Sequence, residues 1–244
     1  MRIIYLLMIV FVGFAACTNS GTQEQANGAD AKAPEATTEA KTTETKTDAA
    51  PEARSVSNTK EGEMQQLNLG DKLPMAAVAM MDISGNKVAP QEAAMENGLL
   101  VTFSCNTCPY VLAWEERYVA AANHALGKKV GVYTVNSNEA KREGDDSYDE
   151  MKTYADKNGY KFSYVVDEKS TFANACGATK TPDVFLFNNK MELVYKGAID
   201  DSPKDASTVE VPYLKNAVDN MIEGKPIDPG TTKSIGCSIK RIKA

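Results

Sequence analysis

The feature that most constrains this chain is a short apolar run that leads directly into two cysteines spaced C-x-x-C. Residues 99–103 are rich in strand-forming side chains, Cys105 and Cys108 follow at once, and Pro109 opens a helix-like pattern. A thiol at a helix N-terminus meets unpaired N–H groups and the positive end of the helix dipole, and both favour the thiolate. This order of strand, C-x-x-C and helix predicts a redox-active dithiol.

The beginning of the chain has the composition of an export signal. Residues 3–14 form an unbroken apolar run of signal-peptide length, too short for a comfortable membrane span. The run ends in two alanines before Cys17, which resembles a bacterial lipobox. We therefore expect residues 1–16 to be a lipoprotein signal peptide and Cys17 to carry the lipid. The alternative is an ordinary secretory signal cut near Ala16, which would leave Cys17 free.

The segment after Cys17 is almost devoid of large apolar side chains. Val56 is the only apolar residue larger than alanine between residues 18 and 62. Such a segment cannot bury enough surface to offset its ordering entropy, so residues 17–62 are expected to form a disordered tether. A coil of about 45 residues has an r.m.s. reach of about 35–40 Å. The tether would hold a folded domain, residues 63–244, clear of a membrane.

Four of the five cysteines follow the tether: Cys105, Cys108, Cys176 and Cys237. An even number of cysteines in an exported protein suggests disulfides. The domain is nevertheless long enough to bury a core without covalent help. These cysteines are therefore expected to be reactive and not structural.

Strand-like and helix-like patterns alternate through the domain and predict one α/β unit. A lead-in at 69–74 and an apolar run at 76–81 precede the first central strand at 99–104. Further strands are expected at 129–135, 162–167, 182–187 and 193–199, with the last two forming a hairpin. Helices are expected at 109–125, 148–158, 170–176 and 211–222.

The sequence around the dithiol, FSCNTCPYV at residues 103–111, resembles the CNxCP redoxins, which are thioredoxin-like relatives of the peroxiredoxin (alkyl hydroperoxide reductase/thiol-specific antioxidant) family. The resemblance implies an α/β thioredoxin-like fold with a central mixed β-sheet flanked by helices. Thr107 stands where this family often has a histidine that could stabilise a thiolate. The similarity covers most of residues 66–244 and includes Gly177-Ala178, residues 181–187, Tyr195-Lys196-Gly197, residues 199–202 and residues 236–240.

The same resemblance implies further site residues. Thr181-Pro182 would place a cis-proline beside the dithiol, where the Thr181 backbone would receive a substrate strand. The alternative is a plain proline at the start of a strand. Cys237, in the C-terminal tail, would be a resolving cysteine, and Cys176, just ahead of the proline loop, would approach the dithiol as a second candidate for that role. The alternative for both cysteines is a small buried hydrophobe.

The sequence leaves open which sulfur attacks a substrate. The family habit favours Cys105, the first cysteine of the motif. Proline prefers the first position of a helix, so Pro109 would instead make Cys108 the capping residue and give it most of the dipole.

Taken together, these features predict an extracytoplasmic thiol–disulfide oxidoreductase that needs no cofactor and no metal. Its partners would be protein or small-molecule thiols and disulfides. It would be lipid-anchored in the cell envelope of a Gram-negative-type bacterium, on the periplasmic face or in the outer membrane. A net charge of −6, without a basic stripe studded with aromatics, excludes nucleic acid as an expected partner.

Two alternative functions remain open at the level of sequence. A thiol peroxidase would use peroxide, and Thr102 does stand three residues before Cys105 as in peroxiredoxins. Gly98 occupies the proline position of that signature, however, and a recognisable activating arginine is missing. A copper-binding thioredoxin-fold protein would need C-x-x-x-C and a distant histidine, and none follows His124.

The remaining polar and aromatic residues of interest are expected to have structural places. We expect His124 at the surface, Trp114 in the core or a pocket wall, Glu115 and Glu116 on a solvated helix face, and Asp200 and Asp201 in a turn.

Overall fold

The computed structural model describes residue 64 and residues 66–242, which belong to the structural unit 50–244. The predicted signal peptide, Cys17 and the tether lie outside the described residues. In the part that is described, no helix combines the length and apolar character needed to cross a membrane.

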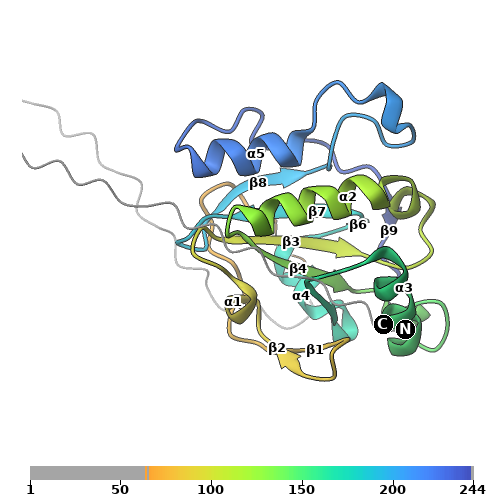
Figure 1. Ribbon diagram of the computed structural model, residues 1–244. Helices are drawn as coiled ribbons and strands as arrows, with labels where there is room; N and C mark the ends of the chain where they lie inside the picture. Colours follow the sequence, from red (N-terminus) through yellow and green to blue (C-terminus); the bar gives the residue numbers. More distant parts are fainter. Residues whose placement is uncertain (1–63, 65, 243–244) are drawn as a thin grey trace, which may run out of the picture. The chain divides into compact units, whose positions relative to one another are not determined.

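A mixed sheet of seven strands forms the centre of this unit, in the order β2-β1-β5-β4-β3-β7-β8 (Figure 1). The strand pairs β3–β4 and β4–β5 are parallel, and the other pairs are antiparallel. The expected central mixed sheet is therefore confirmed. Its strands are β1 (Met80–Asp82), β2 (Lys87–Val88), β3 (Leu99–Ser104), β4 (Gly131–Asn136), β5 (Ser163–Val166), β7 (Asp183–Phe187) and β8 (Leu193–Gly197).

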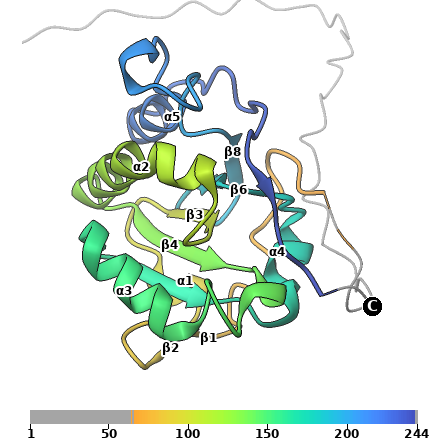
Figure 2. The ribbon, with the colours of Figure 1, turned by 90° about the vertical axis from the view of Figure 1, so that its right-hand side faces the viewer.

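Helices cover both faces of the sheet. Figure 2 shows α2, α3 and α5 on one side of the strands and α4 on the other. The helices are α1 (Pro90–Ala93), α2 (Pro109–Gly127), α3 (Tyr148–Asn158), α4 (Thr171–Cys176) and α5 (Tyr213–Ile222), with short 3-10 turns at Glu139–Lys141, Glu168–Ser170 and Ala206–Thr208.

The central strand β3 shows why the sequence folds into layers. All six of its residues are buried, as expected for a strand covered on both faces. Val101 and Phe103 pack with Phe172 of α4, whereas Leu100 packs with Trp114 of α2 on the opposite face. Alternate side chains of β3 therefore belong to two hydrophobic cores, one on each face of the sheet. The dithiol follows directly at the C-terminal end of this strand.

A second, two-stranded sheet was not expected from the sequence. Strand β6 (Lys180–Thr181) precedes β7, and β9 (Cys237–Ser238) comes from the C-terminal segment. They pair antiparallel with Thr181 opposite Cys237, and the dark blue C-terminal segment runs past β6 in Figure 2. Because each strand has only two residues, neither carries a readable periodicity.

One expectation for α2 was wrong. Glu115 is only 7% exposed and lies inside the molecule, not on a solvated face. The hydroxyl of Tyr154 donates to its Oε2 at 2.6 Å, and burial raises the pKa of the carboxyl. Glu116, one residue further along the helix, is exposed as expected.

Candidate active site

The two cysteines of the motif lie where β3 ends and α2 begins. Cys105 follows the last residue of β3, and Cys108 is the N-cap of α2 with Pro109 at the first helical position. The capping geometry anticipated from Pro109 is therefore present. Both side chains are buried: Cys105 is 2% exposed and Cys108 is 5% exposed.

Strands β6 and β9 bring the other predicted residues to the dithiol. The Cys105 thiol lies 3.4 Å from Thr181 Oγ1, and the Cys108 thiol donates to the Thr181 carbonyl oxygen at 3.2 Å. The Thr181–Pro182 peptide bond is cis, as the resemblance implied. Cys237, which is partly exposed, packs against the cluster formed by Cys105, Cys108 and Val111. Three thiols therefore belong to one cluster.

The three thiols differ in acidity because of this arrangement. The Cys105 thiol, as a donor to the thiolate, lowers the pKa of Cys108, and the Cys237 thiol adds to the effect against the cost of burial. Donation to Cys108, followed by burial, raises the pKa of Cys105. Burial and donation to Cys108 raise the pKa of Cys237. When Cys108 ionises, it gives up its bond to the Thr181 carbonyl, and the S–H groups of its two neighbours can turn towards it.

A buried polar network holds the loop between the two cysteines. The backbone N–H of Asn106 donates to Asp146 Oδ1 at 2.9 Å, and the Tyr164 hydroxyl donates to Asn106 Oδ1 at 2.9 Å. Asp146 is fully buried and also accepts hydrogen bonds from the side chains of Asn136 and Asn138. Sequence reasoning missed this network, because nothing local relates Asp146 to the motif.

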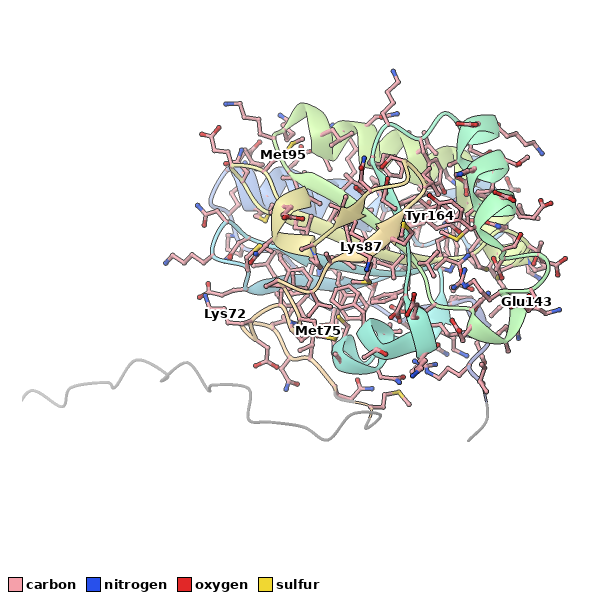
Figure 3. All side chains as sticks on the ribbon, turned by 90° about the horizontal axis from the view of Figure 1, so that it is seen from below. Lys72, Met75, Lys87, Met95, Glu143 and Tyr164 are labelled. Atoms are coloured by element: carbon pink, nitrogen blue, oxygen red, sulfur yellow. The ribbon has the colours of Figure 1, made fainter. Side chains whose placement is uncertain are left out.

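The loop that carries Asp146 reaches from the interior to the surface. Figure 3 shows Glu143 at the outer edge of the molecule and Tyr164 within the packed side chains. Glu143 and Asp145 are exposed, whereas Asp146 is buried. The buried end of this segment, at Asp146, therefore anchors the loop between the two cysteines.

Cys176, at the end of α4, belongs to a different group of side chains. It is buried in the core cluster that contains Phe172 and Phe185, and it is not among the residues packed against the dithiol. Burial raises the pKa of its thiol well above the usual range. Its position fits the small buried hydrophobe that the sequence allowed.

Two other residues of α2 named in the sequence analysis, Trp114 and His124, connect this helix to later segments of the chain. Trp114 is in the core, and its Nε1 donates to Asp200 Oδ1 at 2.7 Å. His124 is half-buried and lies 2.6 Å from Asp219 of α5. Across residues 66–242, no group of three or more His, Cys, Asp or Glu side chains is placed to hold a metal ion.

Comparisons with known proteins show the family. A family model described as Redoxin matches residues 68–213. An uncharacterized conserved protein from Geobacillus kaustophilus shares 34% identity and a TM-score of 0.68, covering 72% of this chain and 94% of its own. A hypothetical protein from Sinorhizobium meliloti 1021 shares 31% identity and a TM-score of 0.67, covering 73% and 97%. No curated protein matches this chain.

Proposed function

Because this chain belongs to the Redoxin family, we propose that it is a thiol–disulfide oxidoreductase in which Cys105 and Cys108 cycle between dithiol and disulfide. One observation carries the proposal: Cys108 caps α2 with the thiols of Cys105 and Cys237 available as donors to its sulfur. A thiolate is the attacking species in disulfide exchange, so the thiol with the lowered pKa is the one prepared to react. This assigns the attack to Cys108.

The exchange then takes place in two displacements at sulfur. The Cys108 thiolate attacks a disulfide R–S–S–R′, forms a mixed disulfide with R and expels R′S⁻. Cys105 gives up its proton and attacks Cys108 Sγ, which closes the Cys105–Cys108 disulfide and expels RS⁻. The two thiolates that leave take up protons, so the substrate gains two electrons and the dithiol loses two. In the opposite direction, the Cys105–Cys108 disulfide oxidises two substrate thiols.

A redox titration of the full chain tests this function. We expect alkylation and peptide mapping to show a Cys105–Cys108 disulfide whose midpoint falls within the span of about −270 to −120 mV known for such dithiols. Trp114, in the helix that Cys108 caps, gives a parallel fluorescence signal. The proposal fails if the two cysteines form no disulfide at any redox potential, or if the chain exchanges disulfides no faster than free cysteine.

A second candidate, thiol peroxidase, is favoured by the third thiol beside Cys108. The Cys108 thiolate would attack hydrogen peroxide, giving a sulfenic acid and hydroxide, and Cys105 or Cys237 would then displace water and form a disulfide. Stopped-flow fluorescence with one equivalent of peroxide decides between the two functions. Oxidation far faster than that of free cysteine supports the peroxidase, and an ordinary thiol rate rejects it.

The location of the protein is part of the same proposal. We infer from the apolar run at residues 3–14 and from Cys17 that the chain is exported and lipid-anchored in the envelope of a Gram-negative-type bacterium. Labelling with a radioactive fatty acid should mark the wild type and leave the Cys17→Ser variant unlabelled. Labelling of both chains, or of neither, would reject the anchor.

A further inference from the structure

The strand edge beside the dithiol is occupied by the protein itself. Sequence reasoning placed a substrate strand against the backbone of Thr181, whereas the structure has β9 there. Antiparallel pairing sets Cys237 directly opposite Thr181 and against Cys108. The C-terminal segment thus holds its own cysteine where an added strand would present a partner's cysteine. The family model ends at residue 213, before this segment.

The segment of residues 234–241, here called the C-terminal strap, is fixed on both sides of Cys237. The backbone at Gly236 also lies very close to the backbone at Thr181, because a Cβ on Gly236 would lie 2.3 Å from the Thr181 carbonyl oxygen. The strap is therefore a built element and not a loose tail. Its hydrogen bonds run from Ser234 Oγ to Asp183 Oδ1 (2.5 Å), Ile239 N–H to the Thr179 carbonyl (3.1 Å), Lys240 N–H to Asn138 Oδ1 (2.8 Å) and Arg241 Nη2 to the Ala178 carbonyl (2.6 Å).

Exposure falls from the strap to the dithiol. Cys237 is partly exposed, whereas Cys108 is 5% exposed and Cys105 is 2% exposed. Disulfide exchange requires the attacking sulfur to approach the attacked one along the S–S axis, so access decides which sulfur reacts. A thiol borne by a macromolecule therefore meets Cys237 before it can reach Cys108.

We propose that Cys237 is the exchange port of the dithiol: external thiols form their mixed disulfide on Cys237, which communicates with Cys105 and Cys108 by internal exchange. This inference rests on the dithiol function proposed above. The partner is a thiol carried on a peptide or a protein, and it reacts without adding a strand at Thr181, because β9 already fills that edge.

The cycle begins from the Cys105–Cys108 disulfide. The Cys237 thiolate attacks Cys108 Sγ, and Cys105 leaves and takes up the proton that Cys237 released. An external thiolate RS⁻ attacks Cys237 Sγ and expels the Cys108 thiolate. A second thiolate R′S⁻ attacks the R sulfur, which yields R–S–S–R′ and regenerates Cys237. Two external thiols lose two electrons and two protons, and the dithiol gains them.

The acidities of Cys108 and Cys237 favour the step in which the external thiolate attacks Cys237. A disulfide breaks faster when the departing thiol has the lower pKa. The thiol of Cys108 has a lowered pKa, whereas that of Cys237 has a raised one. In a Cys108–Cys237 disulfide, attack at the more exposed sulfur therefore also expels the better leaving group.

The first experiment compares rates in the full chain. Oxidised wild type, Cys237→Ser and Cys237→Ala are reduced with a cysteine-containing peptide and followed by alkylation. Ser238→Ala perturbs the same strand without touching a thiol, and Cys176→Ala removes a thiol outside the cluster. We expect both Cys237 variants to react about tenfold more slowly or worse, and both controls to match the wild type. Equal rates in wild type and Cys237→Ser overturn the proposal.

A trapping experiment identifies the sulfur that is attacked. The Cys105→Ala variant, oxidised to the Cys108–Cys237 disulfide, is mixed with the peptide thiol, quenched in acid and mapped. A mixed disulfide on Cys237 supports the port, and one on Cys108 overturns it, as does failure of Cys108 and Cys237 to pair. If wild type itself exchanges no faster than free cysteine, the underlying dithiol function fails. If wild type exchanges well but Cys237→Ser does so equally, only the port fails.

Discussion

At the scale of the residue, the acidity of Cys108 depends on other cysteines. Thr107, between the two cysteines, carries no charge that could stabilise a thiolate, and the start of α2 supplies only part of the stabilisation. The thiols of Cys105 and Cys237 donate to the thiolate, and the backbone N–H groups of Cys237 and of Val111, in the first turn of α2, add to them. Cys105 therefore both stabilises the Cys108 thiolate and pairs with it, so oxidation of the dithiol also removes the thiolate.

The first prediction concerns these donors. Cys105→Ala and Cys237→Ala should each raise the pKa of Cys108, with the larger rise in Cys105→Ala, because each variant removes a donor to the thiolate. The measurement is the pH dependence of Cys108 alkylation by iodoacetamide, read by peptide mapping. Cys176→Ala, at a buried thiol of the other core cluster, is the matched control. Alkylation that follows the ordinary thiol pKa of about 8.5 in the wild type would contradict the assignment.

At the scale of the element, the loop between β3 and α2 is held in position by Asp146. Asp146 accepts hydrogen bonds from the Asn106 backbone and from two further side chains while fully buried. A carboxylate is suited to this position because both of its oxygens accept and neither donates. The geometry of the dithiol is thus set by a residue of the segment that follows β4.

The second prediction tests that anchor. Asp146→Asn replaces one acceptor with a donor that faces other donors, so the free energy of unfolding should fall by about 1–3 kcal/mol. Loss of the negative charge should also lower the pKa of Cys105, which Asp146 helps to raise. Denaturant unfolding measures the first effect, and alkylation of Cys105 measures the second. The exposed neighbour variant Asp145→Asn should stay within about 0.5 kcal/mol of wild type. An equal effect of both variants would show that Asp146 does not anchor the dithiol loop.

At the scale of the whole molecule, several buried carboxyls govern how stability depends on pH. Burial raises the pKa of Glu115 and Asp167, and it raises the pKa of Asp183 to about 6. A carboxyl with a raised pKa binds its proton more tightly in the folded state than in the unfolded chain. Stability from such a group is present below the unfolded pKa and is lost as pH rises to the folded pKa.

The third prediction follows for Asp183, which also accepts the hydroxyl of Ser234 in the strap. The free energy of unfolding should fall as pH rises from about 4 to about 6 and then level off, with at most about 3 kcal/mol from this residue. Asp183→Asn should flatten that part of the profile, and Asp145→Asn should preserve it. Denaturant unfolding at half-unit pH steps measures both. An unchanged slope in Asp183→Asn would show that its carboxyl does not titrate in this range.

The sequence alone predicted the order of the elements and the heart of the site. Periodicity over whole strands and helices is a local property, so β3, α2, α3 and the β7–β8 hairpin appeared close to their observed bounds. The junction of Cys108 with Pro109 is equally local, and the cap was present as expected.

Only the tertiary structure decided which distant residues meet the dithiol. Cys237 reaches Cys108 through a two-residue strand, Asp146 reaches Asn106 across the turn after β4, and Glu115 is buried because α3 covers it with Tyr154. No periodicity or residue spacing in the sequence signals these contacts, because each depends on how separate segments pack. The local sequence determined that a cysteine stands at the start of α2. Long-range packing determined which side chains stabilise it and which thiol stands between it and solvent.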